Sequence, residues 1–353
     1  MILRLFLLLA VLAAWGSSLH AQAPPNVTGD TVYFVDGNTG RDDNAGQTLD
    51  TAWKTINKAA QTLQAGDVVY IRSGIYYESV YPANSGVTYS AYPEADSYDT
   101  VVISGAAPVT GWIRDAGDIW AWDWNPADDW DTKYGWFNIP PQEGATTNGT
   151  KAHILRRELL FADQQREVPT GTNPSYFDGH MLVPTTSRAH LKTVALDTLA
   201  EISSYGAFFV ETDPADRSPI RILARFLRDG DPNAWDAPPV IAAREHLFWP
   251  GGRDAICGAA GTPGDLTVRG LIFRHANSRG QDGAVCPGDR GALFEDVTVE
   301  HTNGVGIDTN GPNPENIGDA GEDHTFRRVT LQYNGQTGIS GECDRCTLVD
   351  SKL

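Results

Sequence analysis

The last third of the chain repeats one pattern of hydrophobic and polar positions. Three segments align without gaps, and each alternates apolar, often β-branched residues with polar ones: Val268–Phe273, Phe294–Val299 and Phe326–Leu331. A fourth copy begins at Leu348. The alternation predicts that each segment is one β-strand with a buried face. A period of roughly 20 to 30 residues with short strands is typical of solenoids, because one coil cannot bury its inner face alone.

Each copy continues through a polar step into a short strand flanked by glycine. We expect the asparagines of the polar steps to form a turn ladder whose amides satisfy backbone groups: Asn277, Asn303 and Asn334. One position of the short strands is always apolar and is predicted to face inward: Val285, Ile307 and Ile339. The neighbouring residues are therefore predicted to line an outer face: Cys286, Asp308 and Ser340.

The region before residue 106 predicts the start of the same stack. Its alternating segments predict further strands: Val32–Val35, Val68–Ile71, Tyr76–Val80, Val87–Ala91 and Val101–Ser104. Apolar residues at helical spacing predict a helix over Trp53–Leu63, with Thr51 as its N-cap and Gly66 as its end. This helix would cover the open first coil, whose strand edge is otherwise unpaired.

Residues 106–262 break the period and contain most of the tryptophans. Alternating strands at Ala207–Glu211 and Arg221–Phe226 predict an inserted β-rich subdomain. Trp120, Trp122 and Trp124 alternate, so they share one face of a strand. If that face is exposed, Trp124 is a candidate for stacking on sugar rings. A buried row would form the subdomain core, which is the commoner fate of aromatic side chains.

The N-terminus predicts an export signal. Arg4 provides a positive start, Leu5–Trp15 form an apolar core, and small residues follow up to Ala23. Cleavage after Ala23 is favoured, and cleavage after Ala21 is the alternative. The apolar run is too short to span a membrane. The predicted domains are a signal peptide (1–23), the cap and first coils (24–105), the insert (106–262) and regular coils (263–353).

Composition and charge narrow the class of partner. The formal net charge is −18 with a pI near 4.7, and no cluster of Lys and Arg is visible. Nucleic acid and anionic membrane surfaces are therefore disfavoured. The acidity fits a monomer that is secreted, or retained in the periplasm, without inserting into a membrane. An anionic polymer would need a bridging cation.

Four cysteines fit an oxidising compartment. Cys257 and Cys286 align on neighbouring coils, where the strand spacing of about 4.8 Å suits a disulfide. Cys343 and Cys346 form a C-x-x-C, for which a local turn disulfide is favoured. A redox motif would need a thioredoxin-like context, and a zinc site would need a second pair.

The opening segments resemble the start of secreted right-handed parallel β-helix proteins. They are Tyr33–Asn38, Trp53–Ala60 and Ala65–Glu78, and Leu266–His275 is similar to the coil pattern of the same proteins. These proteins form the pectate-lyase-like superfamily, which contains polysaccharide lyases and glycoside hydrolases. The resemblance implies an all-β fold, a right-handed parallel β-helix (solenoid) with an N-terminal capping helix and an inserted β-rich subdomain. It covers about half of the chain and does not distinguish between the reactions.

Acidic residues gather where the longest coil loop begins and ends. Asp308 precedes the loop Asn310–Glu322, which also holds Asp319, and Asp323 and His324 follow it. These four are the candidate catalytic residues, because facing carboxylates can act as acid and base on a glycosidic bond. The same oxygens could instead hold Ca²⁺ for a uronate substrate, with Lys or Arg as the base. A solvated acidic loop without function is the third alternative.

Two further groups of residues are candidates for binding. His275 and His301 align with Tyr333 at an outward or corner position, where stacking is the structural alternative to substrate contact, and Arg279 lies close by. The loop 36–44 places oxygen ligands at short spacing: Asp36, Asn38, Asp42 and Asp43. This is a candidate Ca²⁺ site, although it lacks the final bidentate Glu of an EF-hand loop.

Together these patterns predict a secreted β-helix protein that binds a polysaccharide and cleaves it, as a lyase or a glycoside hydrolase. The alternative is a non-catalytic surface or adhesion protein that presents a long uniform face. The chain ends within the fourth copy of the strand pattern, so we also expect further coils beyond residue 353. A natural chain that dimerises through that edge is the alternative.

Overall fold

The fold is known from a computed structural model and consists mostly of short β-strands. The residues that it describes are 31–93, 101–123, 146–147, 150–151, 160–161, 182–185, 187–194, 206–212, 219–227, 230–278, 283–309 and 321–353. Within these ranges, no helix has the length and apolar character needed to cross a bilayer.

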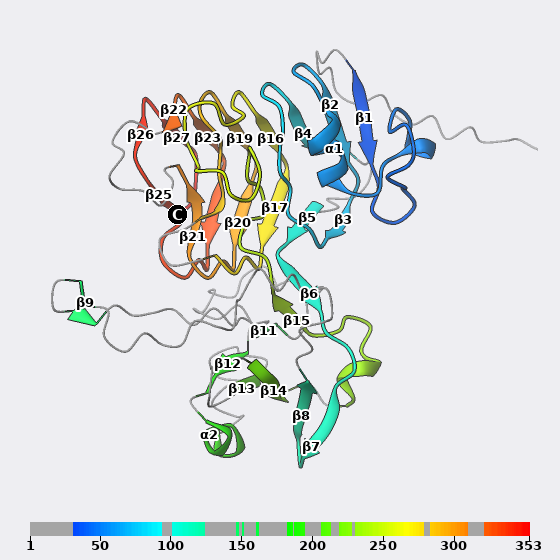
Figure 1. The fold of residues 1–353 in the computed structure, drawn as a ribbon, viewed down its shortest axis with the longest axis vertical. Helices are drawn as coiled ribbons and strands as arrows, with labels where there is room; N and C mark the ends of the chain where they lie inside the picture. Colours follow the sequence, from blue (N-terminus) through cyan, green and yellow to red (C-terminus); the bar gives the residue numbers. More distant parts are fainter. Residues whose placement is uncertain are drawn as a thin grey trace, which may run out of the picture.

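Three parallel sheets run side by side through the upper part of the molecule (Figure 1). The first sheet contains β1 (Val32–Val35), β2 (Val68–Ile71), β4 (Thr88–Ala91), β16 (Thr267–Arg269), β19 (Leu293–Glu295), β23 (Thr325–Arg327) and β27 (Thr347–Val349). The second contains β3 (Gly74–Tyr76), β5 (Val101–Ser104), β17 (Leu271–Arg274), β20 (Thr298–Glu300) and β24 (Thr330–Gln332). The third contains β18 (Gly283–Val285), β21 (Val305–Asp308) and β25 (Ile339–Ser340). A short parallel pair, β22 (Gly321–Glu322) with β26 (Cys343–Asp344), precedes the first sheet.

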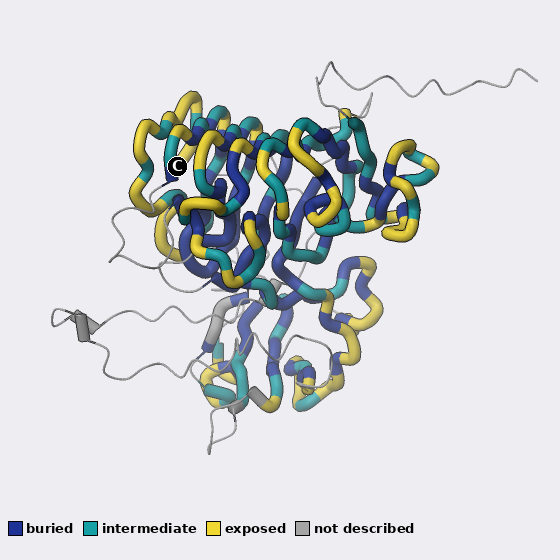
Figure 2. Tube along the Cα trace, turned by 45° about the horizontal axis from the view of Figure 1, so that its top comes forward, coloured by how far each residue is buried: buried dark blue, intermediate teal, exposed yellow. Residues whose placement is uncertain are grey.

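The strand register confirms the repeat that the sequence predicts. In the first sheet Val268 pairs with Phe294, and Phe294 pairs in turn with Phe326. In the third sheet Val285 pairs with Ile307, which pairs with Ile339. Successive turns of the chain thus add parallel strands to the same sheets, an arrangement consistent with an all-β solenoid. The inward residues form one continuous core, and the exposed residues gather at the turns (Figure 2).

Each predicted repeat strand is in fact two strands that meet at a corner, so the prediction of one strand per copy is wrong. The corner residues Gly270, Asp296 and Arg328 have φ of 68°, 56° and 52°, in the left-handed region. Such a residue turns the chain from the first sheet into the second without an intervening loop. The conformation disfavours non-glycine residues by about 1–2 kcal/mol. Stacking of the corners opposes that cost, because Arg328 Nε donates to Asp296 Oδ1 at 2.6 Å.

The helix α1 (Ile56–Thr62) buries Ile56, Ala59 and Ala60 in the same core as the coils, beside β1 (Figure 1). Its N-cap is Thr55, so the predictions of Thr51 as the cap and of a helix starting at Trp53 are wrong. Trp53 instead pairs with Val35 along the free edge of β1. That long-range pairing holds Trp53 in extended backbone and delays the helix by one turn.

The lower subdomain is built mostly from antiparallel strands, with a parallel pair (Figure 1). Its elements are β6 (Ala106–Pro108), β7 (Ile113–Ala116), β8 (Ile119–Asp123), β9 (Thr146–Thr147), β10 (Thr150–Lys151), β11 (Leu160–Phe161), β12 (Val183–Pro184), α2 (Arg188–Thr193), β13 (Gly206–Thr212), β14 (Pro219–Phe226) and β15 (Val240–Ala242). The two strands predicted there are present as β13 and β14, and β13 pairs in parallel with β12. Trp120 and Trp122 belong to the subdomain core, whereas Trp124 lies outside the described residues.

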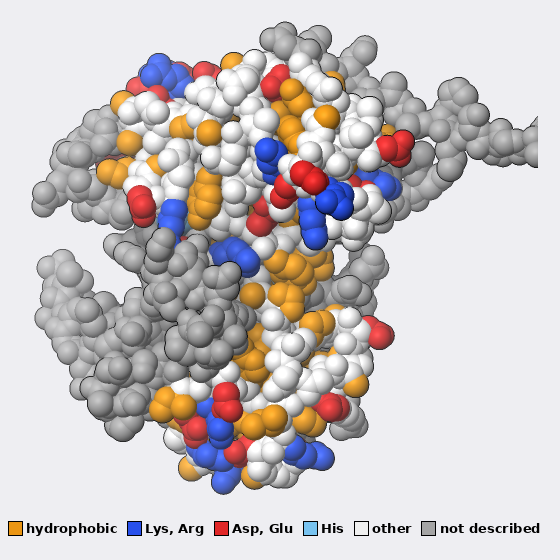
Figure 3. All heavy atoms as spheres, turned by 45° about the vertical axis from the view of Figure 1, so that its right-hand side comes forward, with side chains coloured by type: hydrophobic (Ala, Val, Ile, Leu, Met, Phe, Trp, Pro, Cys, Tyr) orange, Lys and Arg blue, Asp and Glu red, His pale blue; other side chains and the backbone are white. Residues whose placement is uncertain are grey.

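The chain leaves the coil stack and returns to it at one neck. Ala243 and Arg244 both donate backbone N–H groups to the carbonyl of Gly105, the last residue before β6. Hydrophobic side chains gather on the visible face of this neck (Figure 3). Leu247 then lies beside β18 of the third sheet, where its carbonyl accepts from Val80 N–H and its N–H donates to the Ala284 carbonyl, each at 2.8 Å. The insert thus separates two parts of the coil stack in the sequence, but the coils before and after it remain hydrogen-bonded to each other.

Glu78 is a largely buried carboxylate that binds the start of α1. Its two oxygens accept the backbone N–H groups of Ile56 and Asn57, each at 2.9 Å. Burial raises its pKa to about 7, and these two backbone hydrogen bonds oppose the rise. The folded protein therefore holds the Glu78 proton more tightly than the unfolded chain does. Its contribution to stability is complete below the unfolded value near 4.5 and is lost as pH rises through about 7.

We predict that Glu78→Gln flattens the dependence of stability on pH between 4.5 and 7. The wild type should lose on the order of 2 kcal/mol over this window through Glu78, and the variant should lose none of it. The measurement is chemical unfolding of both proteins at several pH values. Comparing their slopes cancels the other titrating groups, and equal slopes would contradict the account.

Candidate active site

The outer face of the third sheet carries the column of residues that the sequence predicts to face outward. Val285 and Ile307 lie in the main core, so the residues that follow them, Cys286 and Asp308, lie on the opposite side of the sheet. Cys286 packs there with Trp249 and Cys257 in a separate cluster. Cys286, Trp249 and Cys257 therefore form a second apolar layer on the outer side of the third sheet, and Asp308 lies beside it.

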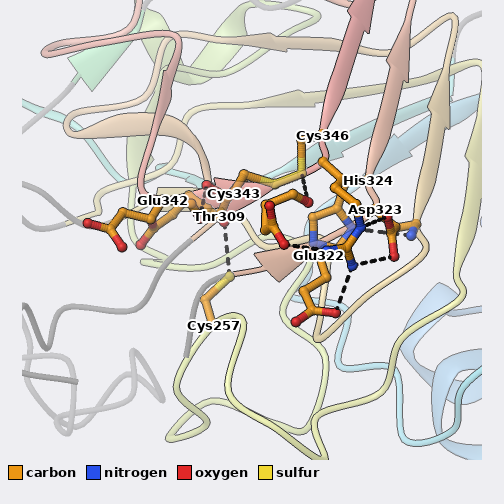
Figure 4. The surroundings of a disulfide bond; sticks show 12 residues. Cys257, Thr309, Glu322, Asp323, His324, Glu342, Cys343 and Cys346 are labelled. Atoms are coloured by element: carbon orange, nitrogen blue, oxygen red, sulfur yellow. Dashed lines mark hydrogen bonds and ion pairs between the residues drawn. A yellow bond between two sulfur atoms is a disulfide. The ribbon is translucent and has the colours of Figure 1, made fainter. Parts of the chain in front are cut away.

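The predicted disulfide joins Cys257 to Cys286, with 5.7 Å between their Cα atoms. It fixes the segment after Trp249, whose indole Nε1–H donates to the Ala255 carbonyl at 2.9 Å. Cys257 Sγ lies 2.9 Å from the carbonyl oxygen of Asp308. The disulfide-bonded Cys257 thus packs against the backbone of Asp308. The second predicted disulfide, Cys343–Cys346, is also present (Figure 4).

Asp308 points outward, as predicted, but it is buried rather than exposed. Only 2% of its surface is accessible. Residue 283, which pairs with Val305 in the adjacent strand, must be glycine, because a Cβ there would lie 2.4 Å from Asp308 Cβ and 2.7 Å from Asp308 N. The alternation of residues along the strand predicts the direction of the Asp308 side chain. It does not predict that the residue is buried, because residues distant in the sequence bury it.

The two ends of the segment 310–320 meet below Asp308. Gly321 N–H donates to the Thr309 carbonyl at 3.1 Å. Thr309 is also held by the next coil, since its N–H and its hydroxyl both donate to the Ser340 carbonyl, at 2.9 and 3.1 Å. Asp319, a predicted catalytic residue, lies outside the described residues. We refer to Asp308, Thr309 and 321–324 as the loop base.

The other two predicted catalytic side chains leave the loop base in different directions (Figure 4). Asp323 sits at an exposed corner with φ 57°, and Arg345 donates to both of its oxygens at 2.7 and 2.9 Å. That hydrogen-bonded guanidinium holds the pKa of Asp323 below its ordinary value. His324 is fully buried, and burial lowers its pKa to about 4. The structure therefore brings the backbones of residues 308–309 and 321–324 together. The side chains of Asp308, Asp323 and His324, however, do not converge on one point.

The histidine ladder lies at the corner that follows the second sheet. His275, His301 and Tyr333 all have φ between 54° and 63°. The His301 and Tyr333 rings stack with centroids 5.0 Å apart, and the His275 and His301 rings lie 5.9 Å apart. Only 3% and 7% of the two histidines is accessible, which describes a packed corner rather than an open surface. Arg279 lies outside the described residues.

The asparagines beside this corner have the role that the sequence predicts. Each side-chain amide donates to a backbone carbonyl: Asn277 to Ala242, Asn303 to Ser278 and Asn334 to Val299. These bonds satisfy backbone carbonyl groups beside the corner. The three acceptors differ: Ala242 lies in β15, Ser278 after β17 and Val299 in β20.

The oxygens of the predicted calcium loop are used within the protein. Asp36 accepts the backbone N–H groups of Asn38 and Thr39 and pairs with Arg72 at 3.1 Å. Asp42 accepts the N–H groups of Lys54 and Thr55, and Asp43 pairs with Arg41 on the surface. Among the described residues, no group of three or more His, Cys, Asp or Glu is arranged to hold a metal ion.

Comparison with known proteins relates the fold to one solved structure in particular. No family model matches the chain, and no curated protein matches it. The chain is similar to XylC, solved in complex with xylose, with a TM-score of 0.63, 20% identity, and coverage of 91% of this chain and 53% of XylC. The chain thus spans about half the length of XylC, and at this identity the match shows a shared fold.

Two further solved structures are more distant. One is a glycoside hydrolase, with a TM-score of 0.48, 13% identity, and coverage of 86% of this chain and 66% of the hydrolase. The other is the GH136 lacto-N-biosidase from Eubacterium ramulus, with a TM-score of 0.27, 11% identity, and coverage of 91% and 55%. Both similarities are too low to bear on this chain.

We predict that Gly283→Ala destabilises the protein and displaces Asp308. The added methyl group meets backbone and Cβ atoms that cannot rotate away, and such overpacking typically costs about 1–3 kcal/mol. Thermal unfolding measures the cost. Ser340→Ala, at the exposed next position of the same column, is the control and should be nearly neutral. Equal melting temperatures for Gly283→Ala and the wild type would contradict the close packing around Asp308.

Proposed function

We propose that this protein is an exported right-handed parallel β-helix of the pectate-lyase-like kind that hydrolyses a neutral polysaccharide at the outer face of its third sheet. The observation that carries the proposal is the position of Asp308. Asp308 follows an inward residue on the strand and is 2% exposed, and its backbone carbonyl lies against the disulfide while the next residue, Thr309, is bonded to Gly321 and to the next coil. The shared fold with XylC, which was solved with xylose, supports a saccharide as the ligand.

The chemistry requires a carboxyl group that is fixed and shielded from water. In glycoside hydrolysis one carboxyl group protonates the leaving oxygen, and a second one activates water or attacks the sugar. Asp308 is the candidate for one of these roles, because its backbone cannot shift without breaking the bonds of Thr309 to the next coil. Asp319 remains the predicted partner. Asp323 is the weaker candidate, since Arg345 occupies both of its oxygens.

Charge favours a neutral substrate over a polyuronate. The chain carries a formal charge of −18, and a field of one sign disfavours a polymer of the same sign. Arg345 already pairs with Asp323, Glu322 and Asp344 beside the loop base. A uronate lyase would therefore need Ca²⁺ to bring substrate and protein together.

We predict that Asp308→Asn lowers the rate of glycan cleavage by about 10²- to 10⁴-fold, the usual contribution of a positioned acid or base, and leaves the melting temperature nearly unchanged. The assay uses the secreted protein on a glycan panel that begins with xylose polymers, and it follows reducing ends. The matched control is Asp344→Asn, an exposed ion-paired carboxylate on the last described coil. An unaffected rate in Asp308→Asn would remove Asp308 from the mechanism. Binding without cleavage by the wild type would instead favour an adhesion protein.

We further predict that activity persists in EDTA, because the hydrolytic mechanism needs no bridging cation. Release of unsaturated uronates, measured by their ultraviolet absorbance, distinguishes elimination from hydrolysis. Loss of activity in EDTA with recovery on adding Ca²⁺ would replace the hydrolase by a lyase.

A further inference from the structure

His324 occupies an interior position that is apolar in the two preceding coils. It follows the left-handed corner residue Asp323, just as Leu266 follows Asp265 and Ala292 follows Gly291. All three of these inward residues are at most 1% exposed. A polar ring in such a column is costly unless it is hydrogen-bonded. The small Ala292 in the coil below leaves room for the imidazole.

One hydrogen bond fixes the protonation of this ring. Ala292 N–H donates to His324 Nδ1 at 3.2 Å, so Nδ1 carries no proton and the neutral ring carries it on Nε2. The lowered pKa agrees with a neutral ring. Within the described residues, no group meets hydrogen-bond geometry at Nε2, although the backbone of Gly288 interacts with the ring and opposes the fall in its pKa. A protonated, buried nitrogen cannot serve as a general base or as a metal ligand.

The Nε2 edge of the ring packs against Gly321 at the loop base. A Cβ on Gly321 would lie 2.5 Å from His324 Nε2 and 3.0 Å from the Thr309 carbonyl oxygen. The same carbonyl accepts Gly321 N–H. The ring, the glycine and the residue after Asp308 thus form one continuous contact from the solenoid interior to the candidate site. The φ of Gly321 is not in the left-handed region, so space alone requires glycine here.

We infer that His324 is a positioning residue that fixes the backbone of Asp308 and Thr309 through Gly321. The hydrogen bond from Ala292 N–H to Nδ1 holds the ring against the preceding coil. The Nε2 edge of the ring limits how closely Gly321 approaches Thr309. The kinetic part of this inference rests on the proposed function. The structural part does not, because the placement of Thr309 can be measured without a substrate.

The test separates the two edges of the ring. In His324→Asn the amide oxygen takes the place of Nδ1 and keeps the bond to Ala292, while the edge facing Gly321 is removed. We expect a modestly lower melting temperature, because the lost ring edge leaves a small cavity, and about tenfold faster hydrogen exchange at the Thr309 and Gly321 amides. On an active glycan, kcat should fall about tenfold or more with little change in KM, because small misplacements of a reacting group cost rate.

A substitution at Gly321 tests the same contact with the His324 ring independently. Gly321→Ala alone should perturb the same amides, because its methyl group collides with the ring. The double variant Gly321→Ala/His324→Asn should recover, because the methyl group then fills the space that the ring edge leaves. Leu266→Ala is the control: it removes buried volume from the same column two coils away, so it should lower stability without changing exchange at Thr309.

Wild-type exchange at Thr309 in His324→Asn, or no recovery in the double variant, would overturn the inference. A wild type that cleaves no glycan while the exchange effects appear as stated would reject the proposed function and leave the positioning role intact. A kcat loss in Leu266→Ala equal to that in His324→Asn would reduce His324 to an ordinary core residue.

Discussion

The stacked part of this protein, which carries the candidate site, depends on each coil covering the apolar inner face of the next. A single coil contributes only a few inward residues, and these are buried only when the neighbouring strands lie in register above and below them. The column Val268, Phe294 and Phe326 shows this, since all three side chains are at most 2% exposed although each belongs to a strand of three residues. A slip of one residue would turn the whole column to the outside. Hydrophobic burial therefore fixes the register.

The same register determines what lies on the outside. Because Ile307 must face the core, Asp308 must face away from it. The outer face is then completed by segments that the stack does not constrain. The disulfide Cys257–Cys286 holds one of them against the Asp308 backbone, and the loop base holds the other side. The large insert leaves and returns at Gly105 and Ala243, so it adds a subdomain without disturbing the register.

The sequence predicts the features that follow from alternation and repetition. These include the pairing of Val285 with Ile307, the outward direction of Asp308 and both disulfides. It does not predict the corners, because left-handed backbone at Arg328 or Tyr333 has no local signal in residues that usually avoid it. The start of α1 was also missed, since Trp53 pairs with β1 from a distance. The burial of His324 depends on the small residue in the coil below it, Ala292, which only the three-dimensional stack brings into contact.

The central claim is that a saccharide binds over the third sheet beside Asp308. A crystal structure of the secreted protein with a bound xylo-oligosaccharide tests it most directly. The account predicts a sugar on the outer face of this sheet, with an oxygen within about 3 Å of the Asp308 carboxylate. A sugar bound only on the subdomain or on the first sheet, with Asp308 still covered, would contradict it.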